Sequence, residues 1–139
     1  MKAVAAFVLA VASFSAPGLH AQEAASVGAA SEAAASWLAI MDAGKTTDAW
    51  DAAAPMLQSA VTRETWASVG AQARAPHGAV KSRQQASASY TRTLPNAPSG
   101  EYVVIQYTTE FANKAGAGET VGPMRQPDGS WKVSGYFIR

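Results

Sequence analysis

The hydrophobic and polar positions of the last forty residues follow the alternation of a β-sheet. Residues 101–111, 119–125 and 130–139 are predicted strands, and the first and last of them are rich in Val, Ile, Tyr, Thr, Trp and Phe. Such side chains fit a pleated, half-buried surface. The tight-turn sequence of residues 127–129, Pro-Asp-Gly, predicts that the last two strands form a hairpin.

A further strand is expected just upstream, at residues 80–90. Its alternation places one set of side chains on one face: Val80, Ala86, Ala88 and Tyr90. The opposite face then carries Lys81, Arg83, Gln85 and Ser89. The proline-rich residues 94–100 link this strand to the next as a hairpin. In the last strand, Trp131, Val133, Gly135 and Phe137 alternate with Lys132, Ser134 and Tyr136.

The upstream half of the chain has a helical period and predicts three helices. The first runs from Ser31, its cap, to Gly44, and it presents Ala30, Ala34, Trp37, Leu38 and Met41 on one face. A short second helix begins near residue 46 and is stopped by Pro55, after which residues 56–58 form a brief turn of helix or a loop. The third begins at a Thr62 cap, ends at Pro76 and has the apolar stripe Trp66, Val69, Gly70 and Ala73. Residues 22–30 are Ala, Ser and Gly with little to bury, so we expect a flexible N-terminus there.

This order predicts an α+β domain in which three N-terminal helices pack on a curved, four-stranded antiparallel sheet. Residues 31–139 form this single domain. The order resembles the nuclear transport factor 2-like cone, in which the sheet curls around the helices and leaves a pocket. The cystatin-like arrangement is its close relative with fewer helices.

The first 21 residues have the layout of a secretory signal peptide. Lys2 precedes an apolar segment of residues 3–14, Pro17 and Gly18 break it, and Ala21 offers a small residue for cleavage. The apolar run is too short to span a bilayer, which needs about 20 residues. We therefore expect a periplasmic or secreted protein of bacterial type with no membrane span after cleavage.

Composition narrows the classes of function. The chain has no Cys, so disulfides and thiolate chemistry are excluded. Of its 11 Lys and Arg, Lys2 lies in the leader, which leaves the remainder balanced by 10 Asp and Glu. Without a basic cluster, nucleic acid is a poor candidate partner.

Few residues suggest catalytic or metal chemistry. His77 is a candidate general base, but it lies in a turn between Pro76 and Gly78, and an exposed turn residue is the favoured interpretation. His77 is the only histidine after the leader, and the carboxylates are scattered, so they do not form a recognisable set of metal ligands. We therefore expect no metal and no cofactor. Asp48 and Asp51 fit a solvated helix start better than a cation site. Residues 116–122 are glycine-rich, but they precede a strand, which is the wrong context for a phosphate loop.

A lined pocket is the sharper hypothesis. Tyr90 and Tyr107 fall on inward rows, and Thr109 lies two residues further along. Buried hydroxyls need hydrogen-bond partners. The predicted sheet also carries Glu119 and, on the row opposite Tyr107, Glu110.

From residue 34 to the end, the chain resembles a family of exported bacterial proteins known as domain of unknown function 4019. In the helical half, the matching motifs are Trp37-Leu38, Asp42-Ala43-Gly44, residues 50–55, Val61-Thr62 with Trp66, Arg74-Ala75-Pro76, Gly78 and Ser82-Arg83. In the sheet, they are Leu94-Pro95, residues 98–107, Phe111 with Lys114, residues 119–121, Pro123-Met124, Asp128-Gly129 and residues 131–139.

This family has no established activity, so the resemblance implies no catalytic residue. It implies Leu where this chain has His77, which weakens an essential role for that histidine. The matched polar residues Arg83, Glu119, Tyr136 and Arg139 are candidates for a shared site. The alternative is structural, with an Arg–Glu pair across strands and a tyrosine at the sheet edge.

The sequence thus favours a non-catalytic, exported module that binds a small apolar ligand or an envelope protein, with a homodimer through the sheet as a further candidate. The alternative is a cone-fold enzyme that uses a pocket carboxylate and a tyrosine in acid–base chemistry. A buried carboxylate with a raised pKa would favour the enzyme. An exposed apolar sheet face would favour binding or dimerisation.

Overall fold

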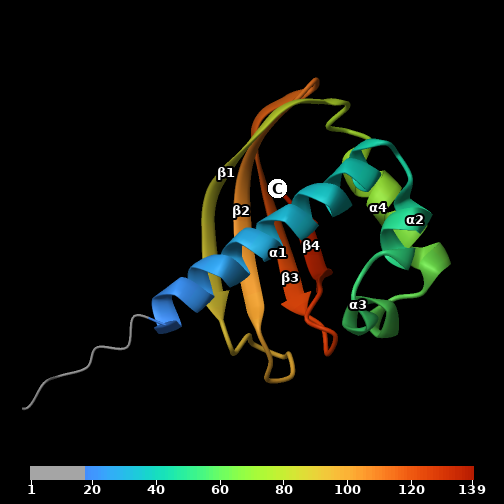
Figure 1. Cartoon of the computed structure of the whole chain (residues 1–139). Helices are drawn as coiled ribbons and strands as arrows, with labels where there is room; N and C mark the ends of the chain where they lie inside the picture. Colours follow the sequence, from blue (N-terminus) through green and yellow to red (C-terminus); the bar gives the residue numbers. More distant parts are fainter. Residues whose placement is uncertain (1–17) are drawn as a thin grey trace, which may run out of the picture.

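A long helix lies across the inner face of a curled four-stranded sheet, and three short helices pack at the far end of that helix (Figure 1). The computed structural model describes residues 18–139. Its helices are α1 (Gly18–Asp42), α2 (Thr46–Asp51), α3 (Pro55–Ala60) and α4 (Arg63–Arg74). Its strands are β1 (Val80–Thr91), β2 (Tyr102–Phe111), β3 (Lys114–Arg125) and β4 (Trp131–Ile138). The predicted α+β class is confirmed.

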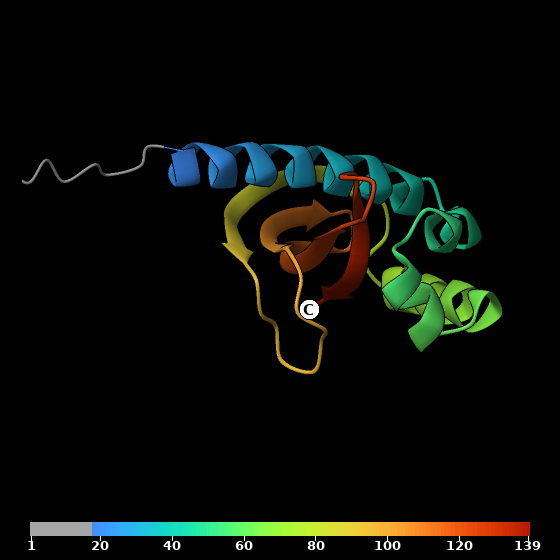
Figure 2. The same ribbon diagram turned by 60° about the horizontal axis from the view of Figure 1, so that its bottom comes forward.

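The strands form an antiparallel meander in the order β1-β2-β3-β4. Figure 2 shows how the sheet curls beneath α1. The core lies between them, where Trp37, Leu38 and Met41 of α1 meet Ile105 and Val121 of the central strands. The inward position predicted for Tyr107 is confirmed, because it is buried in one row of β2 with Val103, Ile105 and Phe111.

The turns that join the strands match their sequence signals. In the β3–β4 turn, the amide of Gln126 donates to the carbonyl of Ser130, and Gly129 has a φ of 87°. A side chain other than glycine would be strained there. Residues 94–100 form the predicted β1–β2 connection. The β2–β3 hairpin is tighter than expected, because β3 begins at Lys114 rather than at residue 119 and takes in most of the glycine-rich loop.

The N-terminal helix is longer than predicted. It begins at Gly18, so Ser31 lies inside it and is not its cap. Residues 22–30, which we expected to be a flexible N-terminus, are helical; their flexibility stays a prediction. Alanine has the highest intrinsic helix propensity, and this stretch is rich in it, so it extends the helix without much burial. Most of the signal-peptide prediction lies outside the described residues. By length and composition α1 could also span a membrane, and an apolar N-terminal helix is compatible with a signal peptide.

Two details of the short helices differ from expectation. Pro55 was predicted to stop a helix, but it begins α3, because proline is well suited to the first helical position. Val69 is 55% exposed, so the predicted apolar stripe of α4 is wrong at that position. The Thr62 cap is confirmed, since its hydroxyl accepts from the Thr65 amide.

Register shifts in both edge strands change the predicted alternation. β1 has two, of which the first lies between Val80 and Ser82. In β1 the register steps from Gln85↔Tyr107 to Ser87↔Gln106, so Ala86 is the extra residue. Ala86 is exposed, and Arg83 faces inward, opposite to the prediction. In β4 the register steps from Gly135 to Val133, and Ser134 is the extra residue. Tyr136 therefore faces inward, while Phe137 is 57% exposed.

Two tryptophans of the core lie close together and differ in one hydrogen bond. The indole of Trp37 donates to the Ala49 carbonyl at 2.8 Å, whereas the buried indole nitrogen of Trp66 has no partner among the described residues. The two rings lie 5.9 Å apart.

Trp37→Phe should therefore cost more stability than Trp66→Phe. The first change strands a buried carbonyl, which typically costs roughly 1–3 kcal/mol beyond lost packing. The second removes a donor that has no bond to lose. Urea unfolding of both variants measures the difference, and equal losses would contradict the role given to the Trp37 bond.

Candidate functional site

Glu119 of β3 is the most deeply buried charged group among the described residues, with a side chain that is 0% exposed. One carboxylate oxygen accepts from Arg83 Nε at 2.8 Å and from Thr109 Oγ1 at 2.5 Å. The other accepts from the Tyr136 hydroxyl at 2.5 Å. Strands β1, β2 and β4 thus each supply one donor to this carboxylate.

Asp42, the last residue of α1, joins a second carboxylate to the same group. It accepts two bonds from the Arg83 guanidinium, at 2.8 and 3.0 Å, and one from Arg74 of α4 at 2.6 Å. Arg74 also lies 3.9 Å from Glu119 and 3.4 Å from the Tyr136 hydroxyl. We call these six residues the polar cluster: Asp42, Arg74, Arg83, Thr109, Glu119 and Tyr136.

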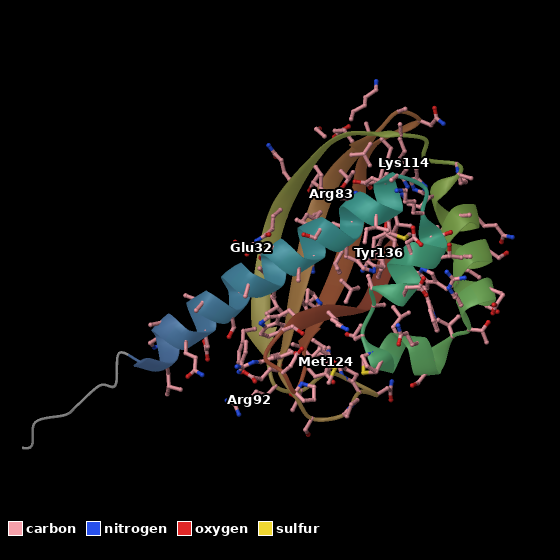
Figure 3. The ribbon with its side chains drawn as sticks, turned by 45° about the vertical axis from the view of Figure 1, so that its right-hand side comes forward. Glu32, Arg83, Arg92, Lys114, Met124 and Tyr136 are labelled. Atoms are coloured by element: carbon pink, nitrogen blue, oxygen red, sulfur yellow. The ribbon has the colours of Figure 1, made fainter. Side chains whose placement is uncertain are left out.

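The polar cluster ties the helices to the sheet. Figure 3 shows Arg83 and Tyr136 close to the C-terminal part of α1. The ring of Tyr136 lies 5.3 Å from that of Trp37, and the Arg74 guanidinium lies 5.3 Å from the centre of the Phe111 ring. Because every charge has an opposite partner, the cluster is electrically neutral as a whole.

The electrostatics keep both carboxylates ionised. Burial alone raises the pKa of Glu119, but hydrogen bonds from Arg83, Thr109 and Tyr136 and the charge of Arg83 outweigh it, so the pKa is lowered from its ordinary 4.5. The pKa of Asp42 is lowered in the same way, since Arg83 and Arg74 outweigh its burial. Burial and the neighbouring Glu119 raise the pKa of Tyr136. Such a carboxylate is a poor proton donor or acceptor near neutral pH.

The structure brings together three of the residues predicted from the sequence: Arg83, Glu119 and Tyr136. Tyr107 lies beside them, directly opposite Glu119 in the β2–β3 register, but its buried hydroxyl has no partner among the described residues. Tyr90 lies elsewhere and donates to Glu101 at 2.9 Å. Arg139 is exposed and pairs through its backbone with Gly118. These last two belong to no shared site with Glu119.

The sequence reasoning missed Asp42 and Arg74 as site residues. Both residues belong to motifs that match the family, and this match is the sequence feature that could have identified them. They lie 77 and 45 positions before Glu119, so neither periodicity nor spacing links them to it.

The remaining candidates have local roles. His77 was expected to be exposed, but it is half-buried, because its ring packs edge-on against Phe111 at 5.1 Å. Its Nδ1 lies 3.0 Å from the Ala73 carbonyl. Asp51 pairs with Arg63 at 2.8 Å, rather than sharing a cation with Asp48. Within residues 18–139, no group of three His, Asp or Glu side chains is placed to hold a metal.

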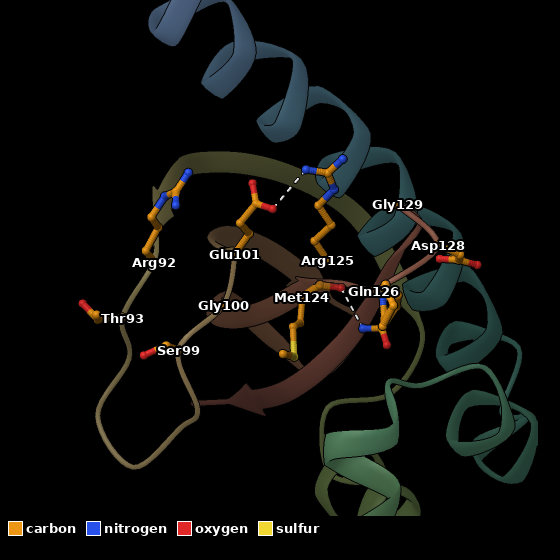
Figure 4. A pocket seen from close by; sticks show the side chains of 11 residues that line it. Arg92, Thr93, Ser99, Gly100, Glu101, Met124, Arg125, Gln126, Asp128 and Gly129 are labelled. Carbon is orange, nitrogen blue, oxygen red and sulfur yellow. Dashed lines mark hydrogen bonds and ion pairs between the residues drawn. The ribbon is translucent and has the colours of Figure 1, made fainter.

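A second site lies at the other end of the sheet. An open hollow of about 900 Å³ lies between the β1–β2 connection and the β3–β4 turn. Arg92, Glu101 and Arg125 line one side of it, and Met124 and Gln126 lie across from them (Figure 4). We call it the rim hollow.

The two arginines of the rim hollow differ. Arg125 donates to the Glu101 carboxylate at 3.0 Å. Hydrogen bonds from Tyr90 and Arg125 and the charges of Arg125 and Arg92 lower the pKa of Glu101, so it stays ionised. Arg92 forms no ion pair with a carboxylate in the described part of the chain. It is exposed and sits at the mouth of the hollow, beside the Thr93 hydroxyl.

Breaking only half of the Arg83–Glu119 pair should destabilise the protein strongly. Removing one partner leaves the other charge buried, at a cost of about 3–5 kcal/mol. We expect Glu119→Leu and Arg83→Met each to lose this much, and the double variant to lose less than the sum of the two. Urea unfolding of the four proteins gives the coupling energy. Additive losses would show that the two groups do not interact.

The free energy of unfolding should also decrease in acid, because two carboxylates of the polar cluster must become protonated there. The folded-state pKa values of Glu119 and Asp42 lie below their ordinary 4.5 and 3.8. Their ionised forms therefore stabilise the fold above those values, and this contribution is lost as the pH falls through the lower, folded-state values.

Unfolding free energies measured from pH 7 down to pH 2 should stay level until about pH 5 and then decline. Glu119→Gln should flatten that decline. Asp51→Asn, which breaks an exposed pair, is the control and should change it little. If Glu119→Gln lost stability below pH 5 as steeply as the parent protein, Glu119 would not be the cause of the decline.

Comparison with known proteins gave one family. The model of the family described as "Protein of unknown function (DUF4019)" matches residues 33–136. Neither the curated proteins nor the solved structures gave a significant match to the chain.

Proposed function

The chain belongs to the DUF4019 family, and we propose that it is an exported, non-catalytic binding module whose ligand site is the rim hollow. Export rests on the leader-like residues 1–21. The binding role rests on the contrast between a polar cluster whose groups all have partners and a hollow in which Arg92 has no carboxylate partner among the described residues.

The polar cluster supports a structural role more than a catalytic one. Both Glu119 oxygens are occupied, its side chain is 0% exposed, and its pKa is lowered rather than raised. A general acid or base needs a pKa near the working pH and access to substrate. The alternative enzyme, based on a pocket carboxylate and a tyrosine, therefore has less support than the binding module.

The rim hollow has the size and the groups of a small-molecule site. Ligand pockets in proteins commonly enclose about 300–1,000 Å³ and carry a few convergent polar groups. The hollow offers the guanidinium of Arg92 and the hydroxyls of Thr93 and Ser99, and Met124 adds an apolar wall. The side-chain nitrogen of Gln126 already donates to the Met124 carbonyl, and Asp128, which lies with Gln126 on the β3–β4 turn, accepts from Ser130. This lining replaces the small apolar ligand expected from sequence with a small polar one.

Arg92, which has no ion pair with a carboxylate among the described residues, selects the charge of that ligand. Arginine binds carboxylates through paired, charge-assisted hydrogen bonds. Arg125 is already paired with Glu101, so Arg92 is the available cation. We therefore propose a small ligand that carries a carboxylate, with its polar body against Gln126 and the hydroxyls.

Titration of the isotope-labelled protein with N-acetylglycine, followed by amide chemical shifts, tests this function. Saturable shifts should gather at residues 92–101 and 124–129, and N-acetylglycinamide, which lacks the charge, should bind at least about tenfold more weakly. The protein should be recovered from the periplasm with an intact mass that begins at Gln22.

Two variants separate the hollow from general charge. Arg92→Gln should remove the preference for the acid over the amide. Lys114→Gln, which removes an exposed cation at the opposite end of β3, should keep it. Equal binding of the acid and the amide, or shifts centred on the polar cluster, would overturn the proposed site.

A further inference from the structure

Strand β1 leaves one edge of the sheet open. It is a terminal strand in the order β1-β2-β3-β4, and along residues 80–91 its only backbone partner in a strand is β2. The other terminal strand is partly closed, because the amide of Ala54 donates to the carbonyl of Val133 in β4 at 2.8 Å. The unpaired backbone groups of an edge strand are a template for another strand.

The middle of this edge carries none of the usual protection. Proteins guard open edges with charged side chains, proline or short strands. Residues 84–91 contain neither charge nor proline, and Gln84, Gln85, Ala86, Ser87 and Ser89 are exposed. The bulge at Ala86 is the one guarding feature in this stretch, which leaves the half of the strand beyond it as a regular edge.

Helix α1 projects beyond this edge. Figures 1 and 2 both show its N-terminal end extending past β1. After the proposed cleavage the helix keeps residues 22–42 and is roughly 32 Å long. Four strands span only about 14 Å between their outer axes. The helix is thus long enough to cover a further strand at the β1 edge. The side that it turns toward the end of β1 carries Gln22, Glu23 and Ser26, which line a small hollow with Tyr90 and Arg92.

We infer that the β1 edge accepts an extended segment of a partner protein as a fifth strand beneath the projecting end of α1. Peptide recognition by strand addition uses main-chain hydrogen bonds for affinity and side chains for selection. Antiparallel pairing with β1 would place the C-terminal end of the segment beside Lys81, an exposed cation. An acidic residue at that end is therefore the complementary choice.

A second copy of the chain fits this edge less well. Antiparallel pairing of two complete β1 strands brings Lys81 of each copy to the part of the other that carries Arg92. Like charges facing one another across strands are destabilising. The homodimer through the sheet that the sequence suggested would thus meet repulsion at both ends if it formed here, so the occupant is a different, acid-ended segment.

A synthetic probe tests the edge directly. It is a labelled nine-residue peptide of alternating valine and threonine that ends in two glutamates, and its matched control ends in two lysines. Fluorescence anisotropy with the purified protein should show the glutamate peptide binding at least about tenfold more tightly. The amide shifts that it causes should map to residues 84–91.

Charge reversal provides the decisive comparison. Lys81→Glu should invert the preference between the two peptides, whereas Lys132→Glu, on the opposite edge strand β4, should leave it unchanged. The same result in both variants, or shifts away from β1, would overturn the inference. So would a concentration-dependent dimer in sedimentation that β1 substitutions abolish, because the edge would then belong to a second copy.

Discussion

A carboxylate buried in the middle of a sheet is stable only if its surroundings replace the water that it has lost. For an isolated ion that loss amounts to many kcal/mol, so the group either becomes neutral or recruits donors. Glu119 recruits donors from β1, β2 and β4, and its lowered pKa shows that they succeed. Much of the fold can be understood as the arrangement that keeps those donors in place.

The arrangement extends beyond the sheet through Arg83. One guanidinium serves Glu119 through Nε and Asp42 through its two terminal nitrogens. Asp42 ends α1, and it also accepts from Arg74 of α4. The end of the long helix, the last short helix and the sheet therefore meet at one set of charges. Apolar packing brings the helix to the sheet, but the hydrophobic effect does not depend on orientation. These hydrogen bonds do, and they hold the C-terminal end of the helix at one position against the sheet.

The sequence predicted the strands, the hairpin turns and the fold class because these depend on local period and on turn chemistry. It failed where a single residue changes the parity of a strand. The extra residues at Ala86 and Ser134 each move the side chains on one side of the bulge to the opposite face of the sheet. The surrounding sequence does not predict either bulge. Arg83 and Tyr136 were assigned to outer faces for this reason. Only the family resemblance suggested that Arg83 and Tyr136 belong to a shared site. Asp42 and Arg74 stand in the same family motifs, but they were not taken as site residues.

The same parity shifts explain why binding is better sought at the margins of the sheet than at its centre. With these bulges in place, the groups of the polar cluster bond one another, and a ligand that entered the cluster would have to break those bonds. The margins have no such constraint. Among residues 18–139, the rim hollow keeps a guanidinium without a carboxylate partner, and the β1 edge keeps backbone groups without a strand partner. A ligand at either place can therefore bind without breaking a hydrogen bond of the polar cluster, and leaving a buried polar group unpaired is the larger cost.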